Sequence, residues 1–82
     1  MDLVSLTENI VKALVTNEEA VSVKEFPTEE ENVILIQVVV AEDDIGAVIG
    51  RGGKIANSIR NIVQASAYIN NLGRVKVNIS AK

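Results

Sequence analysis

A glycine-rich break between two helical segments is the feature that most constrains how this chain can fold. Residues 45–49 (Ile-Gly-Ala-Val-Ile) form an apolar helical turn, and a longer amphipathic helix starts at Lys54. Three of the five glycines lie between them, at positions 50, 52 and 53. Glycine adopts positive φ angles without strain and lets other main chain approach closely. The sequence therefore predicts a tight connection from a short helix into a long one.

The residues before this break predict a helix followed by a β-hairpin. Asp2 or Ser5 can cap the helix, which is expected to end near Thr16. Strands are predicted over 20–26 and 33–40, and the acidic turn between them predicts antiparallel pairing. The second strand is so apolar that both of its faces are expected to be covered, or nearly so. The apolar residues expected to form the inward stripe of the helix are Leu3, Leu6, Ile10, Ala13 and Leu14.

The residues after the strand at 33–40 predict two helices and a final strand. Asp43 and Asp44 are placed to cap the short helix at 45–49. Residues 74–80 alternate between polar and apolar side chains, which is typical of a strand with one buried face. The helical crossover between the last two strands favours parallel pairing. In the long helix, which runs from Lys54 to about Asn70, the residues expected to face inward are Ile55, Ile59, Ile62, Val63 and Ser66, with Ala56 and Ala67 at the close-packed edges.

Together these elements predict an α+β domain with the order α-β-β-α-α-β. The expected architecture is a three-stranded mixed sheet with three helices on one face. Residues 1–82 show no internal repeat, linker or low-complexity tail, and they are expected to form a single domain. Apolar residues make up 48% of the chain, which is enough for one packed core.

Composition argues against several classes of function. The chain has no cysteine and no histidine, so thiolate metal sites and the commonest general base are excluded. The paired carboxylates, at residues 29–31 and at Asp43 and Asp44, lie in turns without a partner that could tune them. We therefore expect no enzyme, no catalytic residue, no metal site and no cofactor. No apolar run approaches the roughly 18 residues of a membrane span, and no signal-peptide layout is present, which favours a cytoplasmic location.

Charge is distributed unevenly along the chain, although the net charge is only −3. Residues 1–44 contain all eleven acidic residues and two lysines, whereas residues 45–82 contain six cations and no acid. The local field governs what binds to a face, so the second half suits an anionic ligand despite the net charge. The alternative is that the acids form a solvated loop and the cations are scattered over the surface.

The glycine-rich connection has the chemistry of a phosphodiester-binding site. The first main-chain N–H groups of a helix lack partners within the helix, and the helix dipole places positive potential beside them. Here Arg51 and Lys54 add two cations at the same point, which favours bound phosphate. In a purely structural interpretation, Gly50 and Gly53 would only end one helix and start the next. The third glycine and the cation inside the connection favour the binding site.

Two nucleotide-binding motifs do not fit this connection. A Walker loop needs glycine where Val48 stands and serine or threonine where Ile55 stands. The dinucleotide-binding fingerprint follows a strand, whereas these glycines follow a helix.

The stretch from Val48 to Gly53, between two helices of a β-α-α-β unit, resembles the Ile-Gly-x-x-Gly element of KH domains. The extra helix and strand before that unit resemble the type II, or prokaryotic, arrangement of the KH domain. Segments 10–15, 40–46 and 56–60 extend this resemblance to the stand-alone bacterial KhpA-type RNA-binding proteins. The similarity covers essentially the whole chain.

The resemblance implies a single-stranded RNA-binding protein that clamps about four nucleotides. With only Phe26 and Tyr68 as aromatic residues, the floor of the groove is expected to be aliphatic. The loop at 70–73, which forms a further wall in the family, is short, so a strong sequence preference is not expected. Residues expected to form the aliphatic floor are Ile45, Val48, Ile49 and Ile55. Residues expected to contact RNA are Ile49, Gly50, Arg51, Gly52, Gly53, Lys54 and Arg60.

The resemblance also implies partners and roles. KhpA-type proteins pair with a larger KH-containing protein, KhpB, and the apolar strand at 33–40 favours a homodimer or such a heterodimer. Implied roles are RNA chaperone or post-transcriptional regulator, with links to cell division, cell shape and cell-wall homeostasis. The alternative, from a different class of function, is a protein-interaction scaffold that kept the KH fold without the RNA role.

Overall fold

The computed structural model describes residues 2–82 and has the predicted order of elements. The helices are α1 (Leu3–Lys12), α2 (Ile45–Ile49) and α3 (Lys54–Ile69). The strands are β1 (Ser22–Pro27), β2 (Val33–Val40) and β3 (Arg74–Ala81). Two single turns of 3-10 helix, η1 (Glu18–Ala20) and η2 (Glu42–Asp44), and the glycine turn η3 (Arg51–Gly53), in which Gly52 and Gly53 have positive φ, complete the described fold. Within the described range, no helix is long and apolar enough to cross a lipid bilayer.

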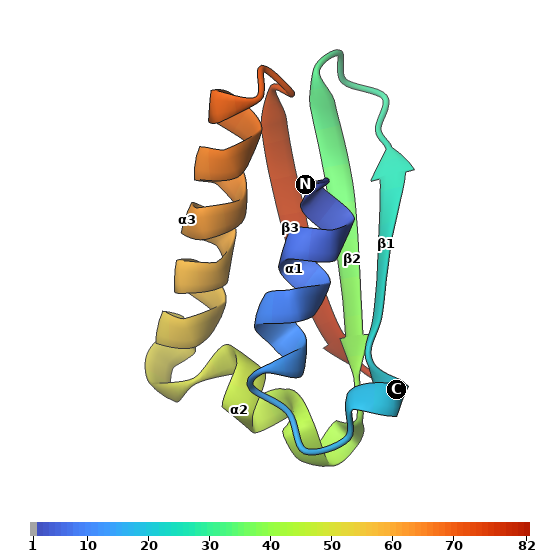
Figure 1. Ribbon diagram of the computed structural model, residues 1–82, viewed down its shortest axis with the longest axis vertical. Coiled ribbons are helices and arrows are strands. Elements are labelled where there is room, and N and C mark those ends of the chain that lie inside the picture. Colours follow the sequence, from blue (N-terminus) through green and yellow to red (C-terminus); the bar gives the residue numbers. More distant parts are fainter. Residues whose placement is uncertain (1) are drawn as a thin grey trace.

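The three strands form one mixed sheet in the order β1-β2-β3. The hairpin pairs β1 with β2 antiparallel, and the crossover through α2 and α3 brings β3 parallel to β2. Both pairings confirm the sequence prediction. All three helices lie on the same face of the sheet, with α1 in front of β2 and α3 along β3 (Figure 1). The outer edge of β3 therefore lies next to α3.

The core lies between this sheet face and the helices. Ile36, Val38 and Val40 alternate along β2 toward the helices and are fully buried. The prediction that both faces of β2 are covered is only partly correct, because no helix within residues 2–82 packs on the opposite face (Figure 1). The β2 residues on that face are all partly exposed: Val33, Leu35, Gln37 and Val39.

Helix α1 begins at the predicted cap, because the carboxylate of Asp2 accepts a hydrogen bond of 2.7 Å from the main-chain N–H of Ser5. The expected inward stripe is partly wrong: Leu6 is half-buried and Ala13 is exposed. Thr7 is buried instead, since its hydroxyl donates to the Leu3 carbonyl at 2.7 Å and so needs no other partner. The helix also ends at Lys12, four residues before the predicted position.

Helix α3 packs a narrower stripe against the sheet than the one predicted: Ile59 and Val63 are buried as expected, with the two edge alanines, but the other predicted residues are not. Ile62 is 49% exposed, and Ile55 and Ser66 are only half-buried. The reason is the 100° turn per residue, which places Ile62 well to one side of the fully buried Val63. The residues that are buried follow helical spacing and include two alanines that permit close approach: Ala56, Ile59, Val63 and Ala67.

Candidate nucleic-acid interface

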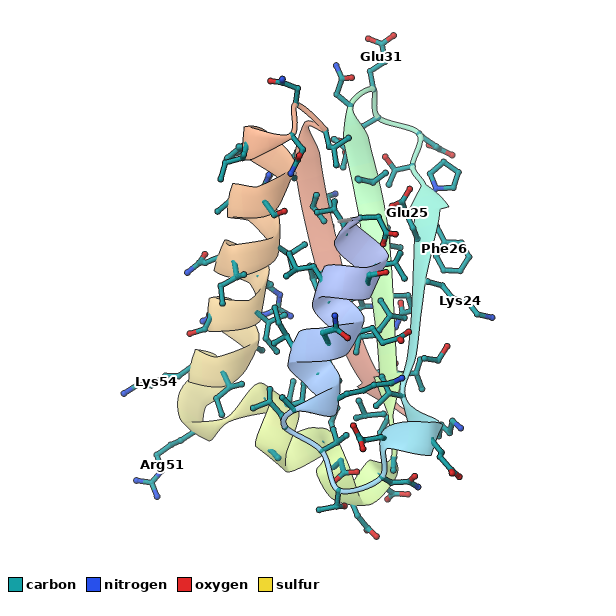
Figure 2. The ribbon with its side chains drawn as sticks, viewed as in Figure 1. Lys24, Glu25, Phe26, Glu31, Arg51 and Lys54 are labelled. Atoms are coloured by element: carbon teal, nitrogen blue, oxygen red, sulfur yellow. The ribbon has the colours of Figure 1, made fainter. Side chains whose placement is uncertain are left out.

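The glycine-rich connection lies at one end of the molecule, where α2 stops at Ile49 and α3 begins at Lys54. Figure 2 shows the side chains of Arg51 and Lys54 pointing away from the body of the protein at this end. Both are exposed, as is Gly52, whereas Ile49, Gly50 and Gly53 are partly buried. The structure thus brings six of the seven predicted contact residues together in one protruding loop.

The geometry of the loop requires glycine most strongly at Gly50. This residue has φ 75° and ψ 173°, a combination that is accessible essentially only to glycine. A Cβ atom at this position would lie 2.7 Å from Cγ1 of Ile55, which is too close for any side chain. Gly52 also has a positive φ, of 64°, but a Cβ there would meet nothing within 4 Å. Gly50 therefore fixes the loop against α3, while Gly52 leaves its tip open.

Main-chain hydrogen bonds inside the loop leave only some of its donors available. The N–H of Gly50 donates to the Gly46 carbonyl at 2.9 Å, and that of Gly53 donates to the Gly50 carbonyl at 3.2 Å. Among residues 2–82, no acceptor bonds the N–H of Arg51 or Gly52. Fewer main-chain N–H groups are therefore free to bind a ligand than the sequence predicted, and those that remain lie at the exposed Arg51–Gly52 tip.

The expected aliphatic floor beside this tip needs one correction. Val48 is fully buried in the core, because it faces inward from α2, and it cannot contact a ligand. Ile45, Ile49 and Ile55 are half-buried and present part of their side chains to solvent. The floor that remains for contact with bases or sugars is small and aliphatic.

Arg60 lies two turns along α3 from the loop, beside the outer edge of β3. Its Nε donates to the Val77 carbonyl at 3.1 Å, and its Nη1 donates to Oδ1 of Asn57 at 3.2 Å. These bonds hold the guanidinium between α3 and β3 while its remaining N–H groups face solvent, since the residue is exposed. Arg60 can therefore bind phosphate from a fixed position, at one side of the loop rather than within it.

Gln64, one turn further along α3, also bonds the segment at the start of β3, and it was not among the site residues expected from the sequence. Its Nε2 donates to the Gly73 carbonyl at 3.0 Å, and its Oε1 accepts from the N–H of Val75 at 2.9 Å. Asn57, Arg60 and Gln64 share one side of α3 at helical spacing, which is the signal that could have revealed the stripe. Together they tie α3 to the free edge of the sheet.

Replacing Gln64 by alanine is expected to lower the free energy of unfolding by about 1–2 kcal/mol, because it leaves two main-chain groups at the start of β3 without partners. Urea unfolding measures the change, and amide hydrogen exchange at Val75 is expected to accelerate. The control is Asn61→Ala on the same helix, which removes an exposed side chain that makes no hydrogen bond within residues 2–82. Equal losses of unfolding free energy in the two variants would contradict the role of Gln64 in joining α3 to β3.

Asp44 fixes the other end of α2, in a way that differs from the predicted cap. Its side chain makes no capping bond to α2, and the residue is only 4% exposed. Oδ1 accepts from the Thr16 N–H at 3.0 Å and the Thr16 hydroxyl at 2.8 Å, and Oδ2 accepts from the Asn17 N–H at 3.0 Å. These bonds, those from Thr16 foremost, lower the pKa of Asp44. The carboxylate thereby anchors the segment after α1 to the start of α2.

Asp44→Asn is expected to destabilise the protein at neutral pH, because an amide NH₂ cannot accept the bonds that one carboxylate oxygen accepts. The folded pKa is lowered, so the stabilisation is complete above the unfolded value of about 3.9 and is lost as the pH falls through the folded pKa. The difference in unfolding free energy between wild type and variant should therefore shrink from neutral pH to about pH 2. Asp43→Asn, at an exposed neighbour, is the control, and a difference that is independent of pH would contradict this role.

The acid-free half of the chain forms one continuous side of the molecule. Helices α2 and α3 and strand β3 contact one another, and β3 lies at the edge of the sheet. Within residues 2–82, the ion pair that reaches this half from an acid is Lys76 with Glu30, at 3.8 Å. The positive charge inferred from the sequence is therefore concentrated in space around the glycine loop and the β3 edge.

This arrangement of elements, with a glycine loop between the two helices of the crossover, is that of a type II KH domain. The family model described as KhpA/KhpB, KH domain, matches residues 4–79. The chain belongs to this family. An RNA-binding protein KhpA from Caldanaerobacter subterraneus subsp. tengcongensis is 45% identical over 62 residues, which are 76% of this chain and 80% of the relative. One from Clostridium acetobutylicum is 40% identical over 74 residues, which are 90% and 95% of the two chains.

Solved structures show the same fold inside a larger protein. A crystal structure of Era in complex with MgGDPNP and nucleotides 1506–1542 of 16S ribosomal RNA aligns with a TM-score of 0.68 at 16% identity. A structure of Era from Aquifex aeolicus aligns with a TM-score of 0.67 at the same identity. In each case the match covers 98% of this chain and 30% of the Era chain. At this identity the similarity concerns the fold alone.

Proposed function

We propose that this protein binds single-stranded RNA and holds about four nucleotides against the loop from Gly50 to Gly53. The observation that carries the proposal is the Arg51–Gly52 tip, where two unbonded main-chain N–H groups lie beside exposed cations. Gly50 and Gly53 shape the loop, Lys54 supplies the second cation, and Arg60 binds the strand further along α3. Ile49 adds an aliphatic contact beside the loop. The family and its curated relatives, which are named RNA-binding proteins, support this function.

The same features predict weak binding with low sequence selectivity. Few cations contact phosphate and no aromatic platform adjoins the loop, so the dissociation constant of one domain is expected to be about micromolar or weaker. With only a few phosphates neutralised, the affinity should fall only gradually as salt increases. Two domains acting together would bind more tightly than one.

The test is to replace Arg51 and Gly52 together by aspartate and to measure binding of a short single-stranded RNA by fluorescence anisotropy. The proposal requires that binding is lost while the fold is kept. Unchanged binding would favour the alternative function, in which the domain serves as a protein-interaction scaffold.

We further propose that the protein pairs with a second KH domain, either its own copy or that of a larger KhpB-like protein. An apolar patch at the end of α3 supports this pairing, since Ile62, Tyr68, Ile69 and Leu72 are 49%, 64%, 80% and 46% exposed. Residues 62 and 69 are two turns apart and therefore lie on the same side of the helix. Sedimentation of the wild type and of Ile69→Asp tests this, and a strict monomer at high protein concentration would contradict self-association.

The cellular roles proposed here rest on family membership alone. They are RNA chaperone or post-transcriptional regulator in the cytoplasm, with effects on cell division, cell shape and cell-wall homeostasis. Sequencing the RNA that co-purifies with wild type, compared with the aspartate double variant, would identify the targets through which such roles act.

A further inference from the structure

The sheet face that no helix covers is organised into rows by the register of the strands. Phe26 pairs with Leu35, which pairs with Lys76 on the other side. In the next row Lys24 pairs with Gln37, which pairs with Asn78. Side chains of directly paired residues point to the same face of a sheet. Further residues on this face are Ser22, Val33, Val39, Arg74 and Ser80.

This face has positive charge and carries no acidic strand residue. Lys24, Lys76 and Arg74 all point toward it, while the acid in β1, Glu25, pairs with the buried Ile36 and so belongs to the opposite face. Figure 2 shows Lys24 and Phe26 on one side of β1 and Glu25 on the other. Because side chains alternate along the strands, the cations of the strands lie on the helix-free face and the acid of β1 lies on the opposite face.

One acid reaches this face from the β1–β2 loop. Glu30 lies 3.8 Å from the ammonium group of Lys76, and the two side chains are 64% and 53% exposed. A pair at this distance and exposure contributes little energy and is screened by salt. A phosphate that approaches Lys76 therefore displaces Glu30 at small cost.

The centre of the face combines a fixed polar cluster with an exposed ring. Asn78 Nδ2 donates to Gln37 Oε1 at 3.0 Å, and Gln37 Nε2 donates to Ser80 Oγ at 3.2 Å. The ring of Phe26, which is 44% exposed, lies at the edge of the same surface beside Leu35. Stacking on such a ring contributes about 1–3 kcal/mol per base in proteins that bind single strands.

We propose that this helix-free face, defined by Lys24, Phe26, Gln37, Lys76 and Asn78, is a second contact surface for single-stranded RNA. The inference rests on the proposed function, because it extends the path of the strand that the glycine loop holds. The strand would leave the loop along α3, cross the free edge of β3 and lie across the three strands. These strands together are only about 10 Å wide.

Charge decides between RNA and a second copy of this chain as the occupant. A twofold pairing through this face would bring each cation of one copy toward the cations of the other. Such like-charge contacts oppose association, whereas a polyanion is attracted by all of them. The apolar patch at the end of α3 has no comparable charge, since residues 61–72 contain no charged side chain, and α3 itself lies on the opposite face of the sheet (Figure 1).

The test measures the affinity of the full chain for two oligouridylates. One has about five nucleotides, and the other has about twenty, which exceeds the site size of a typical single-strand-binding domain. The double variant Lys24→Gln with Lys76→Gln is expected to weaken binding of the long RNA about tenfold and to leave the short RNA unaffected. Its salt slope for the long RNA should fall by about 1.4, or 0.7 for each lost phosphate contact. Phe26→Leu, which removes the ring and keeps the apolar volume, should also weaken only the long RNA. Lys12→Gln on α1 is the matched control and should change neither affinity.

Each outcome separates this inference from the proposed function. If the lysine variant binds the long RNA like wild type while the Arg51 and Gly52 double variant does not bind, the second surface is wrong and the glycine loop stands. If only the lysine variant loses binding, the glycine loop is wrong and the sheet face is an RNA site by itself. Chemical-shift changes at Lys24 and Lys76 that depend on protein concentration without RNA would instead make the face a contact between copies and overturn the inference.

Discussion

Arg51→Asp combined with Gly52→Asp is expected to reduce the affinity for a short single-stranded RNA at least 100-fold. The variant should lose little stability. The two carboxylates would lie beside the unbonded N–H groups where phosphate is expected to bind. Like charges placed in contact cost several kcal/mol of binding free energy. A loss of about 2.7 kcal/mol already corresponds to a 100-fold lower affinity. The fold should survive because both residues are exposed and a Cβ at Gly52 meets nothing within 4 Å. The positive φ of Gly52 should cost about 1–2 kcal/mol of stability.

Two measurements make this result specific. Circular dichroism and urea unfolding must show that the double variant is folded under the binding conditions. Asn9→Asp, which adds one carboxylate to the exposed side of α1, must leave the affinity nearly unchanged and so show that a negative charge far from the loop does not weaken binding. A folded double variant that binds the short RNA like wild type would show that the loop is not the RNA site.

Local sequence signals were sufficient to predict the elements that carry the site. The strand Val33–Val40, the short helix Ile45–Ile49 and the start of α3 at Lys54 lie where the pattern placed them. Each is defined by residues close in sequence, since an apolar run, a glycine break and a change of period are all local features. The parallel pairing of β2 with β3 followed from the helical crossover between them.

Contacts between distant segments could not be predicted in the same way. The carboxylate of Asp44 bonds residues 27 and 28 positions away, so its local role as a helix cap was the only visible one. The positions of Arg60 and Gln64 depend on α3 lying along the free edge of β3, which is a property of the packed fold. The position of the glycine loop could be predicted because its main-chain conformation, with positive φ at Gly50, Gly52 and Gly53, is encoded by the glycines themselves.

Gly50→Ala is expected to lower the free energy of unfolding by about 3 kcal/mol, the largest effect on stability of any glycine-to-alanine substitution in the loop. Its φ of 75° and ψ of 173° lie in a region that costs other residues about 1–3 kcal/mol. The added Cβ would also lie 2.7 Å from Cγ1 of Ile55, so α3 or the loop must shift, at a further cost typical of overpacking. Urea unfolding should show a lower midpoint at an unchanged slope.

Gly52→Ala is the matched control, because it places the same methyl group at a positive φ in open space. It should cost only about 1–2 kcal/mol, so the difference between the two variants measures the contact with Ile55 and the rarer conformation of Gly50. Ile55→Ala separates these two contributions, since it removes the nearest atom and should reduce the cost of Gly50→Ala in the double variant. Equal costs for Gly50→Ala and Gly52→Ala would mean that the first glycine does not hold the loop against α3.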